Sequence, residues 1–343
     1  MNQLPEGRGY VVITDFLEPN TGRDLSDAIQ KVIDEHPMRT IFFPDGEYVL
    51  KKPICTSANP EHSVALQLSN YAVLKAADGW EHTEAMVRLG AAEPFNSIYE
   101  NGSNYYFSGG IIDGNMVANG IAIESGRETV VRDLSIKHTF VGLHIKHGAN
   151  NGSSDADIQS VNIVGNGKKD SIGVLVEGCD NTLTNMRIAA VQTGVLLKGN
   201  GNFLRNIHPL FTYHYDHPES ESIPYAESVA FRDLNFVNWY DYCYSDHMAT
   251  GFRFSKNSRP IYLNCFATWY AAKGNMEVAF KADGPFTASV TNPRIHFRED
   301  TTHNAVLVVG EEGGNGFIEN PVFKNGHNIH DITYKKYLTG REL

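Results

Sequence analysis

The sequence contains few cysteines, no long apolar run and no signal-peptide pattern. Its four cysteines, Cys55, Cys179, Cys243 and Cys265, lie far apart and lack the close spacing of metal ligands, so we expect reduced thiols. No stretch approaches the roughly 18 apolar residues of a membrane span, and residues 1–10 lack an apolar run of signal-peptide length. These absences predict a cytoplasmic protein that has no membrane partner.

Positive charge is also scarce. The chain has 29 lysines and arginines against 40 aspartates and glutamates, which gives a formal net charge of -11. Long-range repulsion therefore disfavours nucleic acids, anionic lipids and, more weakly, polyuronates as partners, although a local basic cleft could override it. The hydrophobic content of 41% is sufficient for a core and argues against general disorder.

A short glycine-bounded pattern recurs along the chain. Each copy begins with glycine, continues with alternating apolar residues and ends with a second glycine; the copies are residues 120–126, 142–148, 173–178 and 194–199. Their starts are separated by 22 (142−120), 31 (173−142) and 21 (194−173) residues. Such a period is typical of a solenoid in which each repeat forms one coil. We therefore expect a single elongated domain over residues 1–343, with regular coils over residues 86–330.

A second strand-like segment follows each glycine pattern and continues the repeat beyond the last copy. The same polar position in these segments holds Asp133, Ser160, Asn185, Asn206, Asp233, Asn264, Asn292 and Asn320. These residue types suit corners because they bond neighbouring backbone groups and tolerate the left-handed conformation. The register predicts a parallel β-helix of roughly eight to ten coils, an internal structural ladder of polar side chains, and inward-facing side chains at Ile188 and Ile295.

Two segments stand apart from the repeat. Residues 24–36 have the apolar spacing of an amphipathic helix, with Asp24 as a candidate N-cap and Pro37 after its end. A helix there would cover the open edge of the first coil. Residues 213–228 are polar and aromatic, and we interpret them as an inserted loop on the working face.

Three segments resemble a known superfamily. Asp24 with Ala28-Ile-Gln30, followed by Ile41-Phe-Phe-Pro-Asp-Gly-Glu-Tyr-Val49, is similar to the opening of pectate-lyase-like proteins, and Ser108-Gly-Gly-Ile-Ile-Asp-Gly114 resembles a coil of the glycosidases among them. The resemblance covers roughly residues 10–330. It implies an all-β fold, the single-stranded right-handed parallel β-helix with an N-terminal capping helix. The Asp-Asp pair and Gly-His-Gly motif of polygalacturonases are absent, so no catalytic residue is carried over.

The repeat register itself locates a candidate site. Adjacent coils are about 4.8 Å apart, so similar corners of successive coils should be neighbours. Aligning the corner after the second strand brings together Trp239, Tyr240 and Asp241, then Trp269 and Tyr270, then Arg298, Glu299 and Asp300, bordered by Tyr213 and His214. Aromatic faces accept the apolar surfaces of sugars, and glycosidic cleavage uses two carboxyl groups. We therefore predict Asp241, Glu299 and Asp300 as catalytic and the other seven as substrate-binding.

These observations favour a carbohydrate-active enzyme that cleaves a glycosidic bond in a neutral oligosaccharide, as a hydrolase or a glycosyl transferase. Within the superfamily, the inulin fructotransferases and difructose-dianhydride enzymes resemble it best, because they act on neutral sugars; that resemblance implies a homotrimer with sites between subunits. We expect no metal and no cofactor, because His214, Asp216 and His217 read better as a solvated loop than as ligands. The alternatives are a non-catalytic glycan-binding or tailspike-like β-helix, and a polysaccharide lyase or epimerase.

Overall fold

The computed structural model describes residues 9–93, 106–147, 153–211, 222–269, 277–297, 306–311 and 313–324. The chain divides into two compact units: unit 1 comprises residues 1–139 and 143–161, and unit 2 comprises residues 140–142 and 162–343. That the whole chain is one domain stays a prediction. No helix among the described residues is both long enough and apolar enough to cross a membrane.

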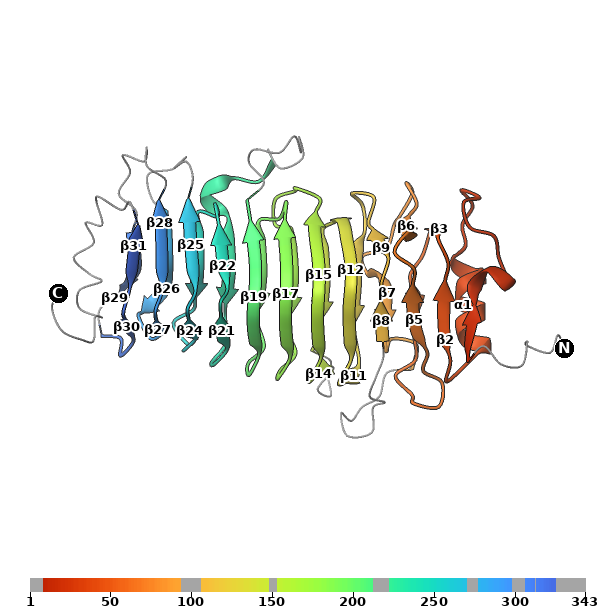
Figure 1. The fold of residues 1–343 in the computed structure, drawn as a ribbon, viewed down its shortest axis with the longest axis horizontal. Helices are drawn as coiled ribbons and strands as arrows, with labels where there is room; N and C mark the ends of the chain where they lie inside the picture. Colours follow the sequence, from red (N-terminus) through yellow and green to blue (C-terminus); the bar gives the residue numbers. More distant parts are fainter. Residues whose placement is uncertain are drawn as a thin grey trace. The chain divides into compact units, whose positions relative to one another are not determined.

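Unit 1 combines one α-helix with parallel strands (Figure 1). The helical elements are η1 (Ile13–Asp15) and α1 (Ser26–Glu35). One sheet contains β1 (Tyr10–Val12), β2 (Thr40–Phe43), β3 (Gly46–Leu50), β5 (Ala65–Leu68), β6 (Ala72–Ala76), β8 (Tyr106–Ser108), β9 (Ile111–Asp113) and β12 (Val130–Thr139). The other strands are β4 (Ile54–Cys55), β7 (Ala85–Leu89), β10 (Asn119–Ile123), β11 (Gly126–Arg127) and β14 (Ser153–Ser154). Two strands, β13 (Val141–Ile145) and β15 (Asp157–Gly165), contain residues of both units.

Unit 2 repeats one coil, in which a strand of one sheet is followed by a bent strand of the other (Figure 1). The first sheet contains β16 (Ile172–Val176), β18 (Thr193–Leu197), β20 (Val229–Asp233), β23 (Thr250–Phe254), β26 (Val278–Pro285) and β29 (Val306–Glu311). The second contains β17 (Thr182–Ala189), β19 (Phe203–Leu210), β21 (Trp239–Asp241), β22 (Tyr244–Asp246), β24 (Ile261–Leu263), β25 (Phe266–Trp269), β27 (Ser289–Thr291), β28 (Arg294–Phe297), β30 (Phe317–Glu319) and β31 (Val322–Lys324). A short helical turn, η3 (Tyr225–Glu227), precedes β20.

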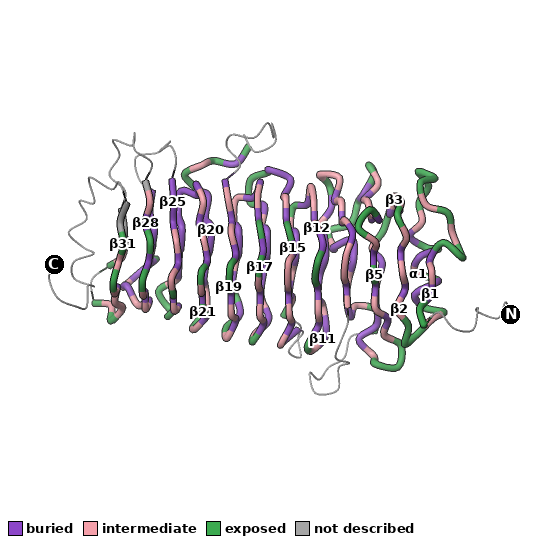
Figure 2. The backbone as a smooth tube through the Cα atoms, viewed as in Figure 1, coloured by how far each residue is buried: buried purple, intermediate pink, exposed green. Residues whose placement is uncertain are grey.

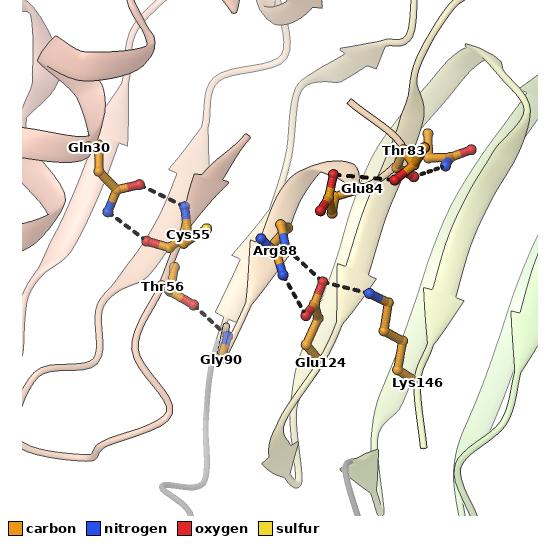
Figure 3. A network of polar contacts seen from close by, with 10 residues as sticks. Gln30, Cys55, Thr56, Thr83, Glu84, Arg88, Gly90, Glu124 and Lys146 are labelled. Carbon is orange, nitrogen blue, oxygen red and sulfur yellow. Dashed lines mark hydrogen bonds and ion pairs between the residues drawn. The ribbon is translucent and has the colours of Figure 1, made fainter. Parts of the chain in front are cut away.

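The helix α1 covers a strand edge of unit 1, as the sequence predicted for residues 24–36. Its buried face includes Ile29, Val32 and Ile33. The side chain of Gln30 donates to the carbonyl of Cys55 (2.9 Å) and accepts from its amide (2.7 Å), so it pairs with β4 as another strand would (Figure 3). This pairing satisfies backbone groups that an open edge would leave exposed. The N-cap is Leu25 rather than Asp24, whose carboxylate accepts from the first helical amide, that of residue 26.

A charged network lies beside this edge in unit 1. Arg88 donates from Nε and Nη2 to the two carboxylate oxygens of Glu124, at 2.7 and 2.9 Å, and Lys146 donates to Glu124 Oε1 at 2.8 Å (Figure 3). Burial alone raises the pKa of Glu124, but the hydrogen bonds from Arg88 and Lys146 outweigh it and leave the pKa below its usual value. Every charge of this network has a partner, so we interpret it as structural.

The predicted glycine pattern has a packing reason in unit 2. A Cβ on Gly173 would lie 2.6 Å from the carbonyl oxygen of Gly194, and a Cβ on Gly194 would lie 2.5 Å from that of Ala230. Real Cβ atoms do not approach backbone so closely, because such contacts are strongly repulsive. The glycine repeat therefore marks where each coil crowds against the next.

The polar corner positions form bends at which the backbone adopts the left-handed conformation. In β17, Leu183 and Met186 both face the interior although they are three residues apart, since Asn185 lies between them with φ 56°. A residue between two inward neighbours must face outward. Asn185 is accordingly exposed, so the corner is confirmed and its placement inside the coil is wrong.

A buried amide ladder does exist in unit 2, but other residues form it. Asn181, Asn202 and Asn238 are fully buried in the turns before β17, β19 and β21. Asn181 donates from its side chain to Asn202 Oδ1 (2.9 Å), and Asn202 donates likewise to Asn238 Oδ1 (3.1 Å). Each amide thereby satisfies a polar group that burial would otherwise penalise.

The predicted ladder register is wrong at one position. Asp233 ends β20 in the other sheet and is fully buried, where Tyr240 Oη donates to it at 2.9 Å. The corner of that coil is Tyr242, with φ 52°. The prediction assigned residues 231–236 to the second strand of a coil, whereas Asp233 ends the first strand. Both strands alternate in the same way and end in a polar residue, so the sequence pattern alone does not distinguish them. The error amounts to nine residues (242−233).

Stacked aromatic residues occupy part of the interior of unit 2. Phe252 stacks between Phe231 and Phe280, with ring centroids 4.9 and 5.2 Å away and nearly parallel planes. Figure 2 shows the alternation of buried and exposed residues along the strands. Ile188 and Ile295 are buried, which confirms their predicted inward direction. The four cysteines are thiols that form no disulfide with one another, as expected.

Candidate functional site

A groove of about 960 Å³ lies on the outer face of the bent strands of unit 2. Its lining residues are Asn206, Tyr242, Tyr244, Asn264, Phe266, Asn292, Arg294, Ile295, His296, Asn320 and Val322. These residues come from the corners and from the strands β22, β25, β28 and β31 that follow them. Amides and aromatic rings dominate the lining, and none of these eleven side chains is acidic.

Two of the lining rings, those of Tyr244 and Phe266, belong to a stack of aromatic side chains. His208 stacks on Tyr244 with centroids 4.0 Å apart, and Tyr244 stacks on Phe266 at 4.7 Å. The parallel pairing of β22 with β25 sets the second stack, because it places Tyr244 and Phe266 directly opposite each other. The result is a continuous aromatic surface across neighbouring coils.

The corner amides form a second row along the groove. Asn206 donates from its side chain to Asn185 Oδ1 at 2.9 Å, and Asn292 donates to Asn264 Oδ1 at 3.2 Å. Asn264 donates to Asp241 Oδ1 at 3.2 Å instead of to another corner amide. An amide nitrogen carries two donors, so each asparagine that uses one within the row can offer the other to a ligand.

A carboxylate and two histidines lie beside the stacked rings. Asp246 Oδ2 accepts from His208 Nε2 at 3.3 Å, and His247 Nδ1 lies 3.7 Å from Asp246 Oδ1. Burial alone raises the pKa of Asp246, but the interactions with His208 and His247 outweigh it, so that the pKa lies below its usual value. Asp246 is therefore ionised at neutral pH and orients the ring of His208. A histidine held by a carboxylate is a common arrangement for proton transfer.

The predicted residues do not all reach one cleft. Trp239 is 38% exposed, and the Asp241 side chain faces outward, where its Oδ2 lies 3.5 Å from Arg205 Nε. Tyr240 and Trp269 are buried in the interior, so their predicted place in a surface cleft is wrong. Trp269 donates from Nε1 to the carbonyl of Met248 at 2.8 Å.

The register error at Asp233 accounts for Trp239 and Tyr240, whereas Trp269 faces inward although its corner, Asn264, was predicted correctly. Counting from the true corner, Trp269 is five residues after Asn264, whereas Trp239 comes three residues before Tyr242. The pairing of β21 with β24 accordingly places Trp239 beside Ile261. Trp239 and Trp269 therefore lie on different parts of the coil.

The remaining predicted residues, Tyr213, His214, Tyr270, Arg298, Glu299 and Asp300, lie outside the described residues, and their roles stay predictions. Among residues that the structure describes, no group of three or more His, Cys, Asp or Glu side chains is arranged to hold a metal ion.

Sequence reasoning missed Tyr242, Tyr244, Asp246 and His208. Their signal was available in the repeat, because outward positions fall two and four residues after each corner. With Tyr242 as the corner, Tyr244 and Asp246 occupy these two positions; with Asn206, the first is His208. The wrong corner at Asp233 concealed Tyr242, Tyr244 and Asp246, whereas His208 follows the correctly predicted corner Asn206.

Comparisons with known proteins support this architecture. No family model matches the chain. Over 90 residues it is 30% identical to the polygalacturonase QRT3 of Arabidopsis thaliana, a match that covers 26% of this chain and only 15% of that protein.

Three solved structures are similar over most of the chain. A tailspike double mutant of E. coli bacteriophage HK620, in complex with a pentasaccharide, has a TM-score of 0.66 at 10% identity and covers 93% of this chain and 67% of its own. The endo-xylogalacturonan hydrolase of Aspergillus tubingensis has a TM-score of 0.57 at 13% identity, covering 91% and 96%. The alginate lyase of Paenibacillus sp. str. FPU-7 has a TM-score of 0.56 at 13% identity, covering 87% and 97%. The chain thus has the right-handed parallel β-helix fold of pectate-lyase-like proteins, with α1 as its N-terminal capping helix.

Proposed function

We propose that the protein binds a saccharide chain along the groove of unit 2 and cleaves a glycosidic bond there. The single observation that carries this proposal is the combination of stacked rings and corner amides that line the groove. Aromatic faces accept the C–H surfaces of sugars, and amides bond their hydroxyl groups. The corner positions repeat with each coil, about every 4.8 Å, and all but one of those in unit 2 carry an amide, which suits a ligand that is itself a repeating chain.

The proposed proton transfer uses His208 and Asp246. Hydrolysis adds water across the C–O bond: a proton goes to the leaving oxygen, and the water oxygen bonds to the sugar carbon after losing its own proton. His208 would move a proton at the reacting oxygen, while Asp246 holds its ring through the 3.3 Å contact. A second carboxyl group would come from Asp241 or from the predicted Glu299 and Asp300.

The lining also supports a second candidate, cleavage by elimination on an acidic sugar. Arg294 is exposed in the groove, and the lining contains no acid that would repel a uronate. This is the local cationic feature that could override the net charge of -11. In elimination, a base removes the proton beside the sugar carboxylate, a double bond forms, and the leaving oxygen takes a proton. Nothing in the lining selects fructose, so fructosyl transfer is not part of the proposal.

Product analysis tests these proposals. The protein is incubated with oligosaccharides of polygalacturonate, alginate, xylan and inulin, and the products are separated and weighed by mass spectrometry. Hydrolysis yields fragments whose summed mass exceeds the substrate by one water, and elimination yields an unsaturated fragment that absorbs ultraviolet light. Binding without products favours a non-catalytic glycan-binding protein. Neither binding nor products with a panel extended to neutral and acidic glycans of other linkages would refute the proposed function.

A further inference from the structure

The corner row of unit 2 contains one exception. Its positions hold Asn185, Asn206, Tyr242, Asn264, Asn292 and Asn320, all with φ between 51° and 56°. Asparagine tolerates this left-handed region because its short side chain bonds locally, whereas a bulky aromatic residue seldom adopts it. Tyrosine at this corner therefore carries a conformational cost that its neighbours avoid.

The exception also interrupts the hydrogen bonds of the row. Tyr242 has no amide, so Asn264 donates to the neighbouring Asp241 carboxylate rather than to position 242. On the other side, Asn206 donates away from Tyr242, to Asn185. Tyrosine at position 242 therefore lacks two advantages of asparagine at the other corners: tolerance of the left-handed conformation and a side-chain amide that bonds the next corner.

The ring of Tyr242 is placed in the groove rather than against the protein. The residue is 59% exposed and lines the groove together with Tyr244, two positions along the same coil. In sequence it adjoins Asp241, and Asp246 follows four residues later. The exposed ring therefore belongs to the coil that also carries the outward-facing carboxylates.

We propose that Tyr242 is the platform on which one sugar ring of the bound chain stacks, and that it sets the position of this ring relative to Asp241 and Asp246. This inference rests on the proposed function. An exposed, strained aromatic residue that lines a groove is explained when a ligand covers it, because the ligand supplies the contacts that the fold does not. The flat ring favours a pyranose unit, whose apolar C–H face is broad, over a furanose unit.

The test replaces Tyr242 with asparagine, the residue found at the other corners of unit 2. Tyr242→Asn completes the amide row and suits the left-handed backbone, so its thermal midpoint should equal or exceed that of the wild type. Its affinity for the oligosaccharides of polygalacturonate, alginate or xylan that bind the wild type, measured by calorimetry, should fall by about 10- to 100-fold. Tyr242→Phe keeps the ring and should bind within about threefold of the wild type.

Tyr71→Asn is the matched control, because it removes another tyrosine, 75% exposed, from unit 1 and should leave affinity unchanged. Equal binding by the wild type and Tyr242→Asn overturns the inference and leaves the proposed function standing. Loss of binding in Tyr242→Phe as large as in Tyr242→Asn also overturns it, because the hydroxyl would then be responsible. Absence of binding by the wild type across the panel overturns both proposals.

Discussion

Two neighbouring coils of unit 2 have matching strands but very different polar side chains. The Tyr242 coil (residues 229–247) and the Asn264 coil (residues 250–269) pair strand by strand in parallel. Their inward positions are nearly identical: Phe231 opposite Phe252, Tyr240 opposite Tyr262, and Cys243 at the same place as Cys265. Their acids are not shared, since Asp233, Asp241 and Asp246 face Phe254, Leu263 and Thr268. The inward apolar residues determine how the coils stack, and the other positions can differ between coils without changing that stacking.

The largest expected effect concerns an outward acid of the Tyr242 coil. Asp246→Asn should lower turnover on a confirmed substrate by about 100- to 10,000-fold, because His208 loses the carboxylate that orients it. The measurement is kcat/KM together with the thermal midpoint, which should change little. Asp283→Asn, which removes an ion pair with Arg253 (2.8 Å) on the other sheet, is the control. Wild-type turnover in Asp246→Asn would exclude this residue from the reaction.

The next effect is on the interior that the two coils share. Phe252→Ala should lower the free energy of unfolding by about 3–5 kcal/mol, since it opens a cavity between stacked rings. Denaturant titration measures this loss. Leu263→Ala, at a position 37% exposed in the same coil, should cost well under half as much. Equal losses in the two variants would mean that the inward register is wrong.

The buried acid of the Tyr242 coil should give a pH dependence of its own. Burial raises the pKa of Asp233 from 3.8 to about 6, although Asn238 and Tyr240 donate hydrogen bonds to it. A raised folded-state pKa favours the folded form at low pH, and this contribution is lost as pH rises from about 4 to about 6, by up to about 3 kcal/mol.

Asp233→Asn should therefore lack the decline in stability between pH 4 and pH 6 that we expect Asp233 to cause in the wild type. Urea unfolding at intervals across this range measures the slope for both proteins. Acids with a lowered pKa, such as Glu124 and Asp246, act with the opposite sign: their contribution to stability is lost as pH falls from their ordinary pKa towards the lowered one. An identical slope in the variant would show that Asp233 does not control it.

The smallest effect concerns the corner itself. Asn264→Tyr places a tyrosine at the corner of the Asn264 coil, as Tyr242 does in the neighbouring coil. It should destabilise unit 2 by about 1–2 kcal/mol, because tyrosine strains the left-handed bend and two amide contacts are lost. Thermal unfolding measures the change. Thr291→Tyr, one residue before the next corner in an extended strand, is the control and should change the midpoint less. Equal stability of Asn264→Tyr and the wild type would remove the argument that Tyr242 is strained.

The sequence by itself determined the repeat, the capping helix and the kind of residue at the corners. These features are local: glycine marks close backbone approach, residues 24–36 have the helical period, and asparagine tolerates the left-handed bend. The inward direction of Ile188 and Ile295 follows from the same alternation.

Only the tertiary structure decided which strand of a coil each segment becomes. Asp233 and Tyr242 both follow alternating segments, and the length of the intervening turn, which no local pattern sets, determined that Tyr242 is the corner. From this register follow the burial of Tyr240 and the contact of His208 with Asp246, which are 38 residues apart. In a parallel β-helix the side-chain neighbours come from successive coils, so an error in one turn displaces every predicted contact of that coil.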